Sequence, residues 1–315
     1  MKPYLTAILI MLMATVQLKA QRRFDADLIK EPGIWKTSTL GNSISGTAAE
    51  VAKEKTITAA IHNMVKQNFT PMGMLASYGF SYVKNDPPNP SNHFSYQIYF
   101  LKYILNEAGS TKSYEPSIAS NTNIRISANR ASAFSLNEPN EPLAYLTEFP
   151  IQKEGYYLFN LEGGDDRNTY SWLITYDAKL PFNYLTKQAY LEWRRTAILE
   201  GIKLGDTHNV LNKDLLKKNE ELLNSLSATE RNEVAIIEGT PHANEFKRFT
   251  DKNAKYKTIP IVPNLTYFNN KLPKSSPQFF EVYVNVDKTN KVYTGNMEAM
   301  LKAIQISTLK NMLGK

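Results

Sequence analysis

Hydrophobic residues recur at helical spacing in the segment that follows Thr47. Thr47-Ala48-Ala49-Glu50 matches a capping box, in which the threonine oxygen accepts a hydrogen bond from a backbone N–H and the glutamate reaches back. The apolar stripe behind it is formed by Ala48, Val51, Ala52, Ile57, Ala60, Ile61, Met64 and Val65. This pattern predicts a helix that begins after Thr47 and ends near Asn68, before Pro71. The preceding stretch, Arg22–Leu40, is polar and we expect it to be irregular.

The next hundred residues change to short aromatic and aliphatic segments separated by turn residues. Strands are predicted at Met74–Val83, Phe94–Leu105, Ile124–Phe134, Tyr156–Leu161 and Tyr170–Tyr176. A helix remains an alternative for the second of these segments. Gly163-Gly164-Asp165-Asp166 lies between the last two and predicts a hairpin. A curved antiparallel sheet with the long helix laid across it would bury both apolar faces.

The remaining residues favour helices with fewer strands. Thr186 can cap a second helix, a third is predicted at Asn212–Leu226, and a second capping box, Ser227-Ala228-Thr229-Glu230, begins a fourth. Leu180-Pro181-Phe182 is expected to end the strand before the second helix. Strands are predicted at Ile259–Val262 and Phe279–Val286, and a final helix at Met297–Met312. In the later strand, alternation places Glu281, Asn285 and Asp287 on the face opposite Phe280, Val282, Val284 and Val286.

These elements predict an α+β fold: a long helix packed on a curved antiparallel sheet, followed by a more helical α+β part. The element order is analogous to cystatin-like or NTF2-like shapes. The predicted division is 1–20 as a signal peptide, 21–179 as the helix-on-sheet domain and 180–315 as the helix-rich domain. The alternative, in which the last two parts share one core, is left open.

The first residues resemble a secretory signal peptide. Lys2 precedes an apolar run, Leu5–Val16, and Ala20 supplies a small residue at a plausible cleavage point. The run is too short for a transmembrane helix, which needs about 20 apolar residues. We therefore expect an exported protein, periplasmic or extracellular after cleavage, that is not an integral membrane protein. The chain has no cysteine, which excludes disulfides, thiol nucleophiles and thiolate metal sites.

The positive charge is concentrated in the later half of the chain. The whole sequence carries a formal net charge of +7. From Thr186 onward there are 20 Lys and Arg against 14 Asp and Glu. This imbalance favours an anionic partner such as a polyanionic glycan, a lipid headgroup or nucleic acid. The alternative is that dispersed lysines serve solubility alone.

Two segments resemble exported proteins of Bacteroidota that form a family of unknown function. The first is Leu180–Leu191, with the pattern Leu-Pro-Phe followed by Thr-Lys and an apolar pair. The second is Asn264–Gln278, which contains Pro273 and Pro277. The resemblance implies an exported protein of this lineage and supplies no site residues. The residues of the first segment also predict a helix cap at Thr186, and the prolines of the second predict an extended backbone.

Metal, nucleotide and common catalytic motifs are missing from the sequence. The four histidines, His62, His93, His208 and His242, show no metal-ligand spacing. Gly41-Asn42-Ser43-Ile44-Ser45-Gly46 nearly matches a nucleophile elbow but has Ser45 at the fifth position, and Ser307-Thr308-Leu309-Lys310 lacks its companion motifs. Glu162, Asp165 and Asp166 do not have the spacing of an EF-hand loop. The sequence therefore predicts no cofactor and no metal site, and leaves any catalytic residues unknown.

Two compositional features suggest binding rather than catalysis. The densest basic stretch contains Lys247, Arg248, Lys252, Lys255 and Lys257, with Phe249 and Tyr256 between them, as in a polyanion site. Tyr96, Tyr99 and Tyr103 could line a groove for sugars, or simply pack within a sheet. The leading hypothesis is a non-catalytic exported envelope protein that binds a glycan, a polyanion or another envelope protein. The alternatives are a hydrolase acting on envelope or dietary polymers, and polyanion binding by the C-terminal half.

Overall fold

The computed structural model describes residues 26–38, 44–84, 91–106, 113–134, 144–161, 165–205, 209–239 and 245–315. Several predictions from the sequence lie outside these ranges: the signal peptide at 1–20, and the residues Gly41, Asn42, Ser43, Glu162, His208 and His242.

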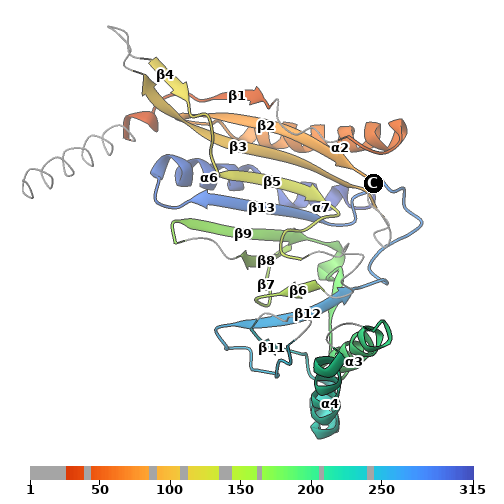
Figure 1. Ribbon diagram of the computed structural model, residues 1–315. Helices are drawn as coiled ribbons and strands as arrows, with labels where there is room; N and C mark the ends of the chain where they lie inside the picture. Colours follow the sequence, from red (N-terminus) through yellow and green to blue (C-terminus); the bar gives the residue numbers. More distant parts are fainter. Residues whose placement is uncertain are drawn as a thin grey trace, which may run out of the picture.

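The described chain contains a large sheet and a small sheet (Figure 1). The large sheet has the order β1-β2-β3-β5-β13-β9-β8-β7, with β4 paired to β3, and the small sheet has the order β10-β12-β11, with β6 paired to β12. The strands are β1 (Ile34–Thr37), β2 (Met74–Val83), β3 (His93–Asn106), β4 (Ser113–Pro116), β5 (Asn123–Ala128), β6 (Ala144–Leu146), β7 (Ile151–Lys153), β8 (Tyr156–Leu161), β9 (Arg167–Ile174), β10 (Phe182–Tyr184), β11 (Ile237–Glu238), β12 (Lys257–Pro263) and β13 (Phe280–Asp287). The helices are α2 (Ala48–Asn68), α3 (Lys187–Lys203), α4 (Asn209–Ser225), α5 (Ala228–Asn232), α6 (Lys291–Ala303) and α7 (Ile306–Met312), with a 3-10 turn at Tyr176–Ala178.

The α+β class predicted from the sequence is confirmed, while the cystatin-like or NTF2-like shape stays a prediction. The helix after Thr47 has both hydrogen bonds of its capping box. The β8–β9 hairpin forms antiparallel pairs as expected. Residues of α2, α6 and α7 share one core with the large sheet, so these helices cover one face of it (Figure 1).

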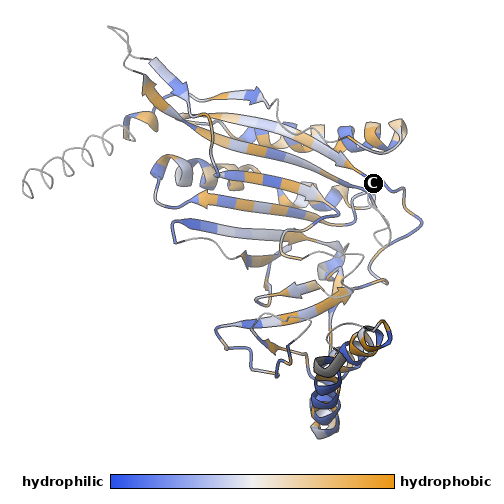
Figure 2. Ribbon diagram, in the orientation of Figure 1, coloured by the Kyte–Doolittle hydropathy of each residue, from blue (hydrophilic) through white to orange (hydrophobic). Residues whose placement is uncertain are grey.

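Strand β13 lies in the middle of the large sheet, between β5 and β9, and is antiparallel to both. It comes from the part of the chain after residue 180, so strands from both sides of the predicted domain boundary form one sheet. The side chains of Val282 and Val284 are fully buried there, in the core beneath α2 and α6. Hydrophobic and hydrophilic residues alternate along β5 and β13 (Figure 2), as a sheet with two different faces requires.

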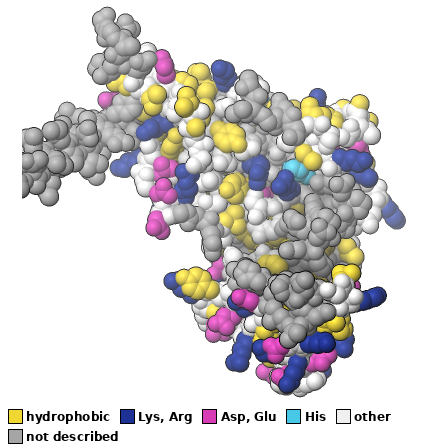
Figure 3. Space-filling model, viewed as in Figure 1, with side chains coloured by type: hydrophobic (Ala, Val, Ile, Leu, Met, Phe, Trp, Pro, Cys, Tyr) yellow, Lys and Arg dark blue, Asp and Glu magenta, His cyan; other side chains and the backbone are white. Residues whose placement is uncertain are grey.

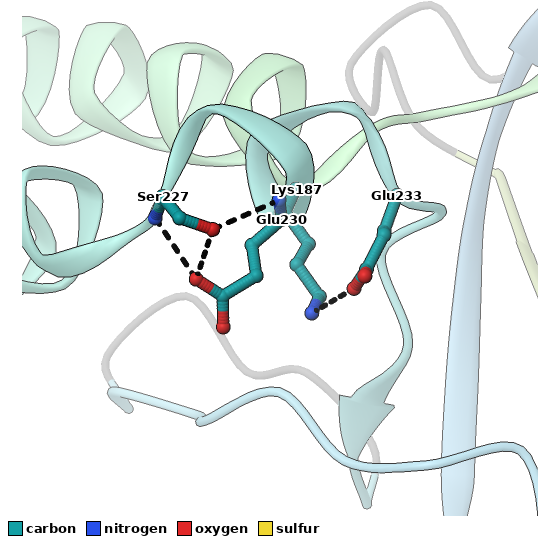
Figure 4. Close-up of polar contacts among 4 residues, drawn as sticks. All are labelled: Lys187, Ser227, Glu230 and Glu233. Atoms are coloured by element: carbon teal, nitrogen blue, oxygen red, sulfur yellow. Dashed lines mark hydrogen bonds and ion pairs between the residues drawn. The ribbon is translucent and has the colours of Figure 1, made fainter.

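The small sheet packs on the other side of the large sheet, near β8 and β9. Their shared core contains aromatic and aliphatic side chains from both sheets: Phe159, Leu173, Phe182, Ile259, Ile261 and Phe279. Beyond the small sheet, α3 and α4 pack against each other. Figure 4 shows how the start of α3 is tied to the end of α5: Lys187 Nζ lies 2.7 Å from Glu233 Oε2, beside the capping box formed by Ser227 and Glu230.

Four local expectations differ from the structure. The segment expected to be irregular contains β1, because the backbone of β2 offers a parallel pairing edge that needs no burial of side chains. Phe182 begins β10 rather than ending a strand, since β12 pairs with it. The strand expected at Ile124–Phe134 ends at Ala128, where Asn129 adopts φ 61°. The final helix is interrupted at Ile304, which is extended and buried in the core. Glu281 lies on the face opposite Val282 and Val284 as expected, and it is buried there.

Candidate functional site

The face of the large sheet that the helices leave uncovered is lined by hydrogen-bonding side chains. We call it the polar face. Cross-strand pairing of β2, β3, β5 and β13 places its residues in three parallel rows. The rows consist of Ser81, Ser95, Ser127 and Glu281; then Gly79, Gln97, Arg125 and Tyr283; then Ser77, Tyr99, Asn123 and Asn285. The opposite, helix-covered face of the same strands carries core residues such as Tyr96, Ile126 and Val284.

Two hollows lie on the polar face and meet at Gln97. The first, the serine hollow, has a volume of about 330 Å³ and is lined mainly by small polar residues and Tyr99: Ser38, Ser77, Gly79, Ser81, Ser95, Gln97, Tyr99, Leu101, Ile118 and Ser120 among them. The second, the arginine hollow, has a volume of about 550 Å³ and extends to the small sheet; its lining includes Gln97, Asn123, Arg125, Ser132, Tyr145, Thr147, Leu161, Thr169 and Tyr283. Cavities of this size suit small-molecule or oligomeric ligands.

Arg125 is held at the centre of the polar face by two neighbours. Its Nη2 donates a hydrogen bond of 2.6 Å to Ser132 Oγ, and its guanidinium lies 5.1 Å from the centre of the Tyr283 ring. The Ser132 hydroxyl in turn donates to Glu281 Oε2 at 2.9 Å, and the Ser132 backbone N–H donates to Glu281 Oε1 at 2.6 Å. These contacts fix the plane of the guanidinium.

In the first row of the polar face Ser95, Ser127 and Glu281 are buried, whereas Ser81 and the other two rows are half-buried. Burial raises the pKa of Glu281 above its usual range, although hydrogen bonds from Ser132 and the charge of Arg125 oppose the shift. Two buried polar atoms around it, Arg125 Nε and Ser127 Oγ, have no hydrogen-bond partner among the described residues. Such atoms are rare in native proteins.

The loop after β5 covers this buried row. Asn129 Nδ2 donates to the carbonyls of Asn92 and Ser276, and its Oδ1 accepts from the Gln278 N–H. Burial, with the charges of Arg130 and Arg125, lowers the pKa of the nearby His93 to about 4. His93 is therefore uncharged at neutral pH.

Of the three tyrosines considered for a sugar groove, only Tyr99 lines a hollow of the described surface. Tyr96 and Tyr103 are 1% and 7% exposed, consistent with the alternative that they pack within the sheet. Tyr96 contributes its hydroxyl to a 3.0 Å hydrogen bond with His62 Nδ1 under α2. Burial also lowers the pKa of His62, which stacks on Tyr78.

The basic stretch lies in a separate place, against β11 and β12. Lys257 is buried and forms a 2.7 Å ion pair with Glu148, and Lys247 forms one with Glu245 at 2.7 Å. Arg248, Lys252 and Lys255 are exposed. Figure 3 shows acidic and basic side chains interspersed in this lower part of the molecule. Lys247, Arg248, Lys255 and Tyr256 line one hollow together with Glu238, so the choice between polyanion binding and solubility stays a prediction.

The other candidates are not brought together. Asp165 and Asp166 lie in the β8–β9 turn, and Ser307–Lys310 forms part of α7 on the helix-covered side. Ile44 and Ser45 pair with β2 rather than forming a strand-to-helix elbow. Across the residues that the structure describes, no three His, Asp or Glu side chains are grouped as metal ligands, and no helix is long and apolar enough to cross a membrane.

Sequence reasoning did not identify Gln97, Arg125, Ser132 or Tyr283 as site residues. A signal was present in the period-two pattern. Ser77, Gly79 and Ser81 alternate with aromatic residues in β2, and Ser95 and Gln97 do the same in β3. The alternation indicates one polar face on each strand. The pairing of β5 with β13, which places Arg125 beside Tyr283, involves distant parts of the chain and has no local signal.

Comparison with known proteins assigns no family: no protein-family model, no curated protein and no solved structure matches the chain.

Proposed function

We propose that this chain is a non-catalytic exported binding protein of the bacterial envelope, and that its polar face binds a glycan. The observation that carries the proposal is the lining of the two hollows. It consists mainly of serine, threonine, asparagine, glutamine and tyrosine, together with a single arginine. Uncharged donors and acceptors match sugar hydroxyls, and aromatic rings offer apolar faces for stacking.

The two tyrosines of the polar face are placed to contact different units of one oligosaccharide. Tyr99 is on β3 and Tyr283 is on β13, with β5 between them. Neighbouring strands are about 4.8 Å apart, so the two positions are separated by roughly 10 Å. Asn123 and Arg125 of β5 lie in the interval between them, and Gln97 lies beside Arg125 on β3.

The hydrolase alternative needs convergent carboxylates, or a Ser–His pair, in a cleft. The described lining of both hollows contains neither an acidic residue nor a histidine. Glu281, the nearest carboxylate in the three rows, is buried and hydrogen-bonded to Ser132. These features favour binding without turnover.

The test is a thermal-shift screen of residues 21–315 against a panel of envelope and plant-type oligosaccharides. A ligand that binds only the folded state at a hundredfold excess over Kd stabilises it by about 2.7 kcal/mol. We expect a shift that Tyr99→Ala strongly reduces. Tyr256→Ala is the matched control, because Tyr256 is an exposed tyrosine beside the basic stretch and lines neither the serine hollow nor the arginine hollow.

Two results would contradict the proposal. If Tyr256→Ala abolishes the thermal shift and Tyr99→Ala retains it, the ligand binds at the basic stretch and not on the polar face. Release of reducing ends from the bound oligosaccharide, abolished by a substitution on the polar face, would show a hydrolase instead.

A further inference from the structure

Arg125 carries the only charge on the described lining of the two hollows. Its guanidinium is half-buried and oriented by Ser132 on one side and by the Tyr283 ring on the other. One of its five donor hydrogens is used by the Ser132 hydroxyl, and Nε has no partner among the described residues. Nε is buried, so the donors available to a ligand in the arginine hollow are the remaining hydrogens of the two Nη atoms.

The charge of Arg125 is not neutralised by direct contact within the described residues, where no carboxylate lies at ion-pair distance from the guanidinium. Ser132 stands between Arg125 and Glu281 and donates both its N–H and its hydroxyl to the carboxylate. Glu281 therefore has its own hydrogen-bond donors, and the outward side of the guanidinium faces a hollow lined by uncharged groups. A single cation in such surroundings suits a single negative charge on the ligand.

The planar fork of a guanidinium matches a carboxylate through two parallel N–H···O bonds. A phosphate dianion is usually bound by more than one cation or by a cluster of backbone N–H groups. The described arginine hollow offers one cation surrounded by side-chain amides and hydroxyls: Gln97, Asn123, Thr147 and Thr169. These groups match the hydroxyls of a sugar ring.

We infer that the ligand is an acidic sugar, a uronic-acid unit within an oligosaccharide, whose carboxylate is bound by Arg125. The ring hydroxyls then face Gln97 and Asn123, and the ring lies beside Tyr283. This inference rests on the proposed function and adds the charge of the ligand to it.

The experiment is calorimetric titration of residues 21–315 with uronic-acid trimers: galacturonate, glucuronate and mannuronate, each beside its fully methyl-esterified form. Esterification removes the charge and leaves the sugar otherwise the same. Hydrogen bonds to charged groups are stronger than neutral ones. We therefore expect at least one acid trimer to bind roughly tenfold to a hundredfold more tightly than its ester.

Two substitutions of Arg125 separate the effect of its charge from the effect of its planar hydrogen-bonding geometry. Arg125→Gln should weaken binding of the acid trimer roughly tenfold or more and weaken binding of the ester much less. Arg125→Lys keeps the charge without the planar fork and should give an intermediate Kd. Arg130→Gln is the matched control, since Arg130 is exposed, follows the same strand and does not line either hollow.

The outcomes distinguish this inference from the proposed function. Equal Kd values for acid and ester, both weakened by Tyr99→Ala and neither by Arg125→Gln, would overturn the acidic-sugar assignment and leave glycan binding intact. Binding of neither form at millimolar concentration, together with no shift in the oligosaccharide screen, would overturn both.

Discussion

At the residue scale, Glu54 is a buried carboxyl group whose ionisation lowers the stability of the folded state. Its side chain is fully buried in α2, and Oε1 accepts one hydrogen bond of 3.0 Å from Asn92 Nδ2. Oε2 and Asn92 Oδ1 have no hydrogen-bond partner in the described residues. Burial raises the pKa of Glu54 above 4.5, and the charge of Glu50 adds to the shift. Compared with the unfolded chain, the folded state therefore favours the protonated form of Glu54.

A raised pKa in the folded state gives stability that is complete below the unfolded pKa and is lost as the pH rises through the folded pKa. We expect Glu54→Gln, which stays uncharged, to increase the free energy of unfolding at pH 7.5 by roughly 1 kcal/mol and to change it little near pH 4. Urea denaturation of residues 21–315 at the two pH values measures this difference.

Glu50→Gln provides a control of opposite sign. Hydrogen bonds from the backbone and side chain of Thr47 lower the pKa of Glu50, so its contribution is present at neutral pH and lost on acidification. We expect this variant to be destabilised at pH 7.5 and less so near pH 4. A gain of stability for Glu54→Gln that is equal at both pH values would contradict the assignment of a charge cost to Glu54.

At the element scale, two capping boxes with similar hydrogen bonds begin helices that differ in how many residues they bury. Thr47 begins α2, which buries seven residues, and Ser227 begins α5, in which no residue is buried. In both, the backbone N–H of the third helical residue donates to the cap hydroxyl over 3.3 Å. We expect Thr47→Ala to lower the free energy of unfolding by about 1 kcal/mol. Ser227→Ala should lower it less, because α5 can open locally without exposing the core.

Urea denaturation followed by far-UV circular dichroism checks the comparison, and amide hydrogen exchange in α5 shows whether the second variant acts locally. Equal losses of global stability in both variants would mean that α5 unfolds together with the core.

The same elements show which features are predictable from sequence. Capping boxes and the β8–β9 hairpin depend on residues a few positions apart, and they form as predicted. The position of β1 and the interruption of the last helix depend on tertiary partners. β1 forms because β2 offers it an edge, and the chain leaves the helix at Ile304, whose side chain enters the core. The local periodicity of the sequence gives no information about either of these tertiary partners.

At the scale of the whole molecule, the candidate site is a product of strand pairing between distant segments. Alternation shows that β3 and β13 each have a polar face, yet only the register brings Gln97, Arg125 and Tyr283 into one row. Glu281 illustrates the limit: alternation places it on the face opposite Val282 and Val284, but does not show that the loop containing Ser132 covers it. The sequence shows which polar residues lie on one face of each strand, but it does not show which of them become neighbours across strands.

The central position of β13 has a consequence for the predicted division at residue 180. A fragment of residues 21–179 contains β5 and β9 but lacks the strand that pairs with both, together with α6 and α7. Its apolar sheet face would lose the fully buried Val282 and Val284 and the helix residue Met300. We expect this fragment to show no cooperative thermal transition and narrow amide dispersion by NMR, whereas residues 21–315 unfold in one sigmoidal step. A dispersed spectrum and a sigmoidal transition for the fragment would instead show that the first part folds by itself and that β13 adds to a sheet already formed.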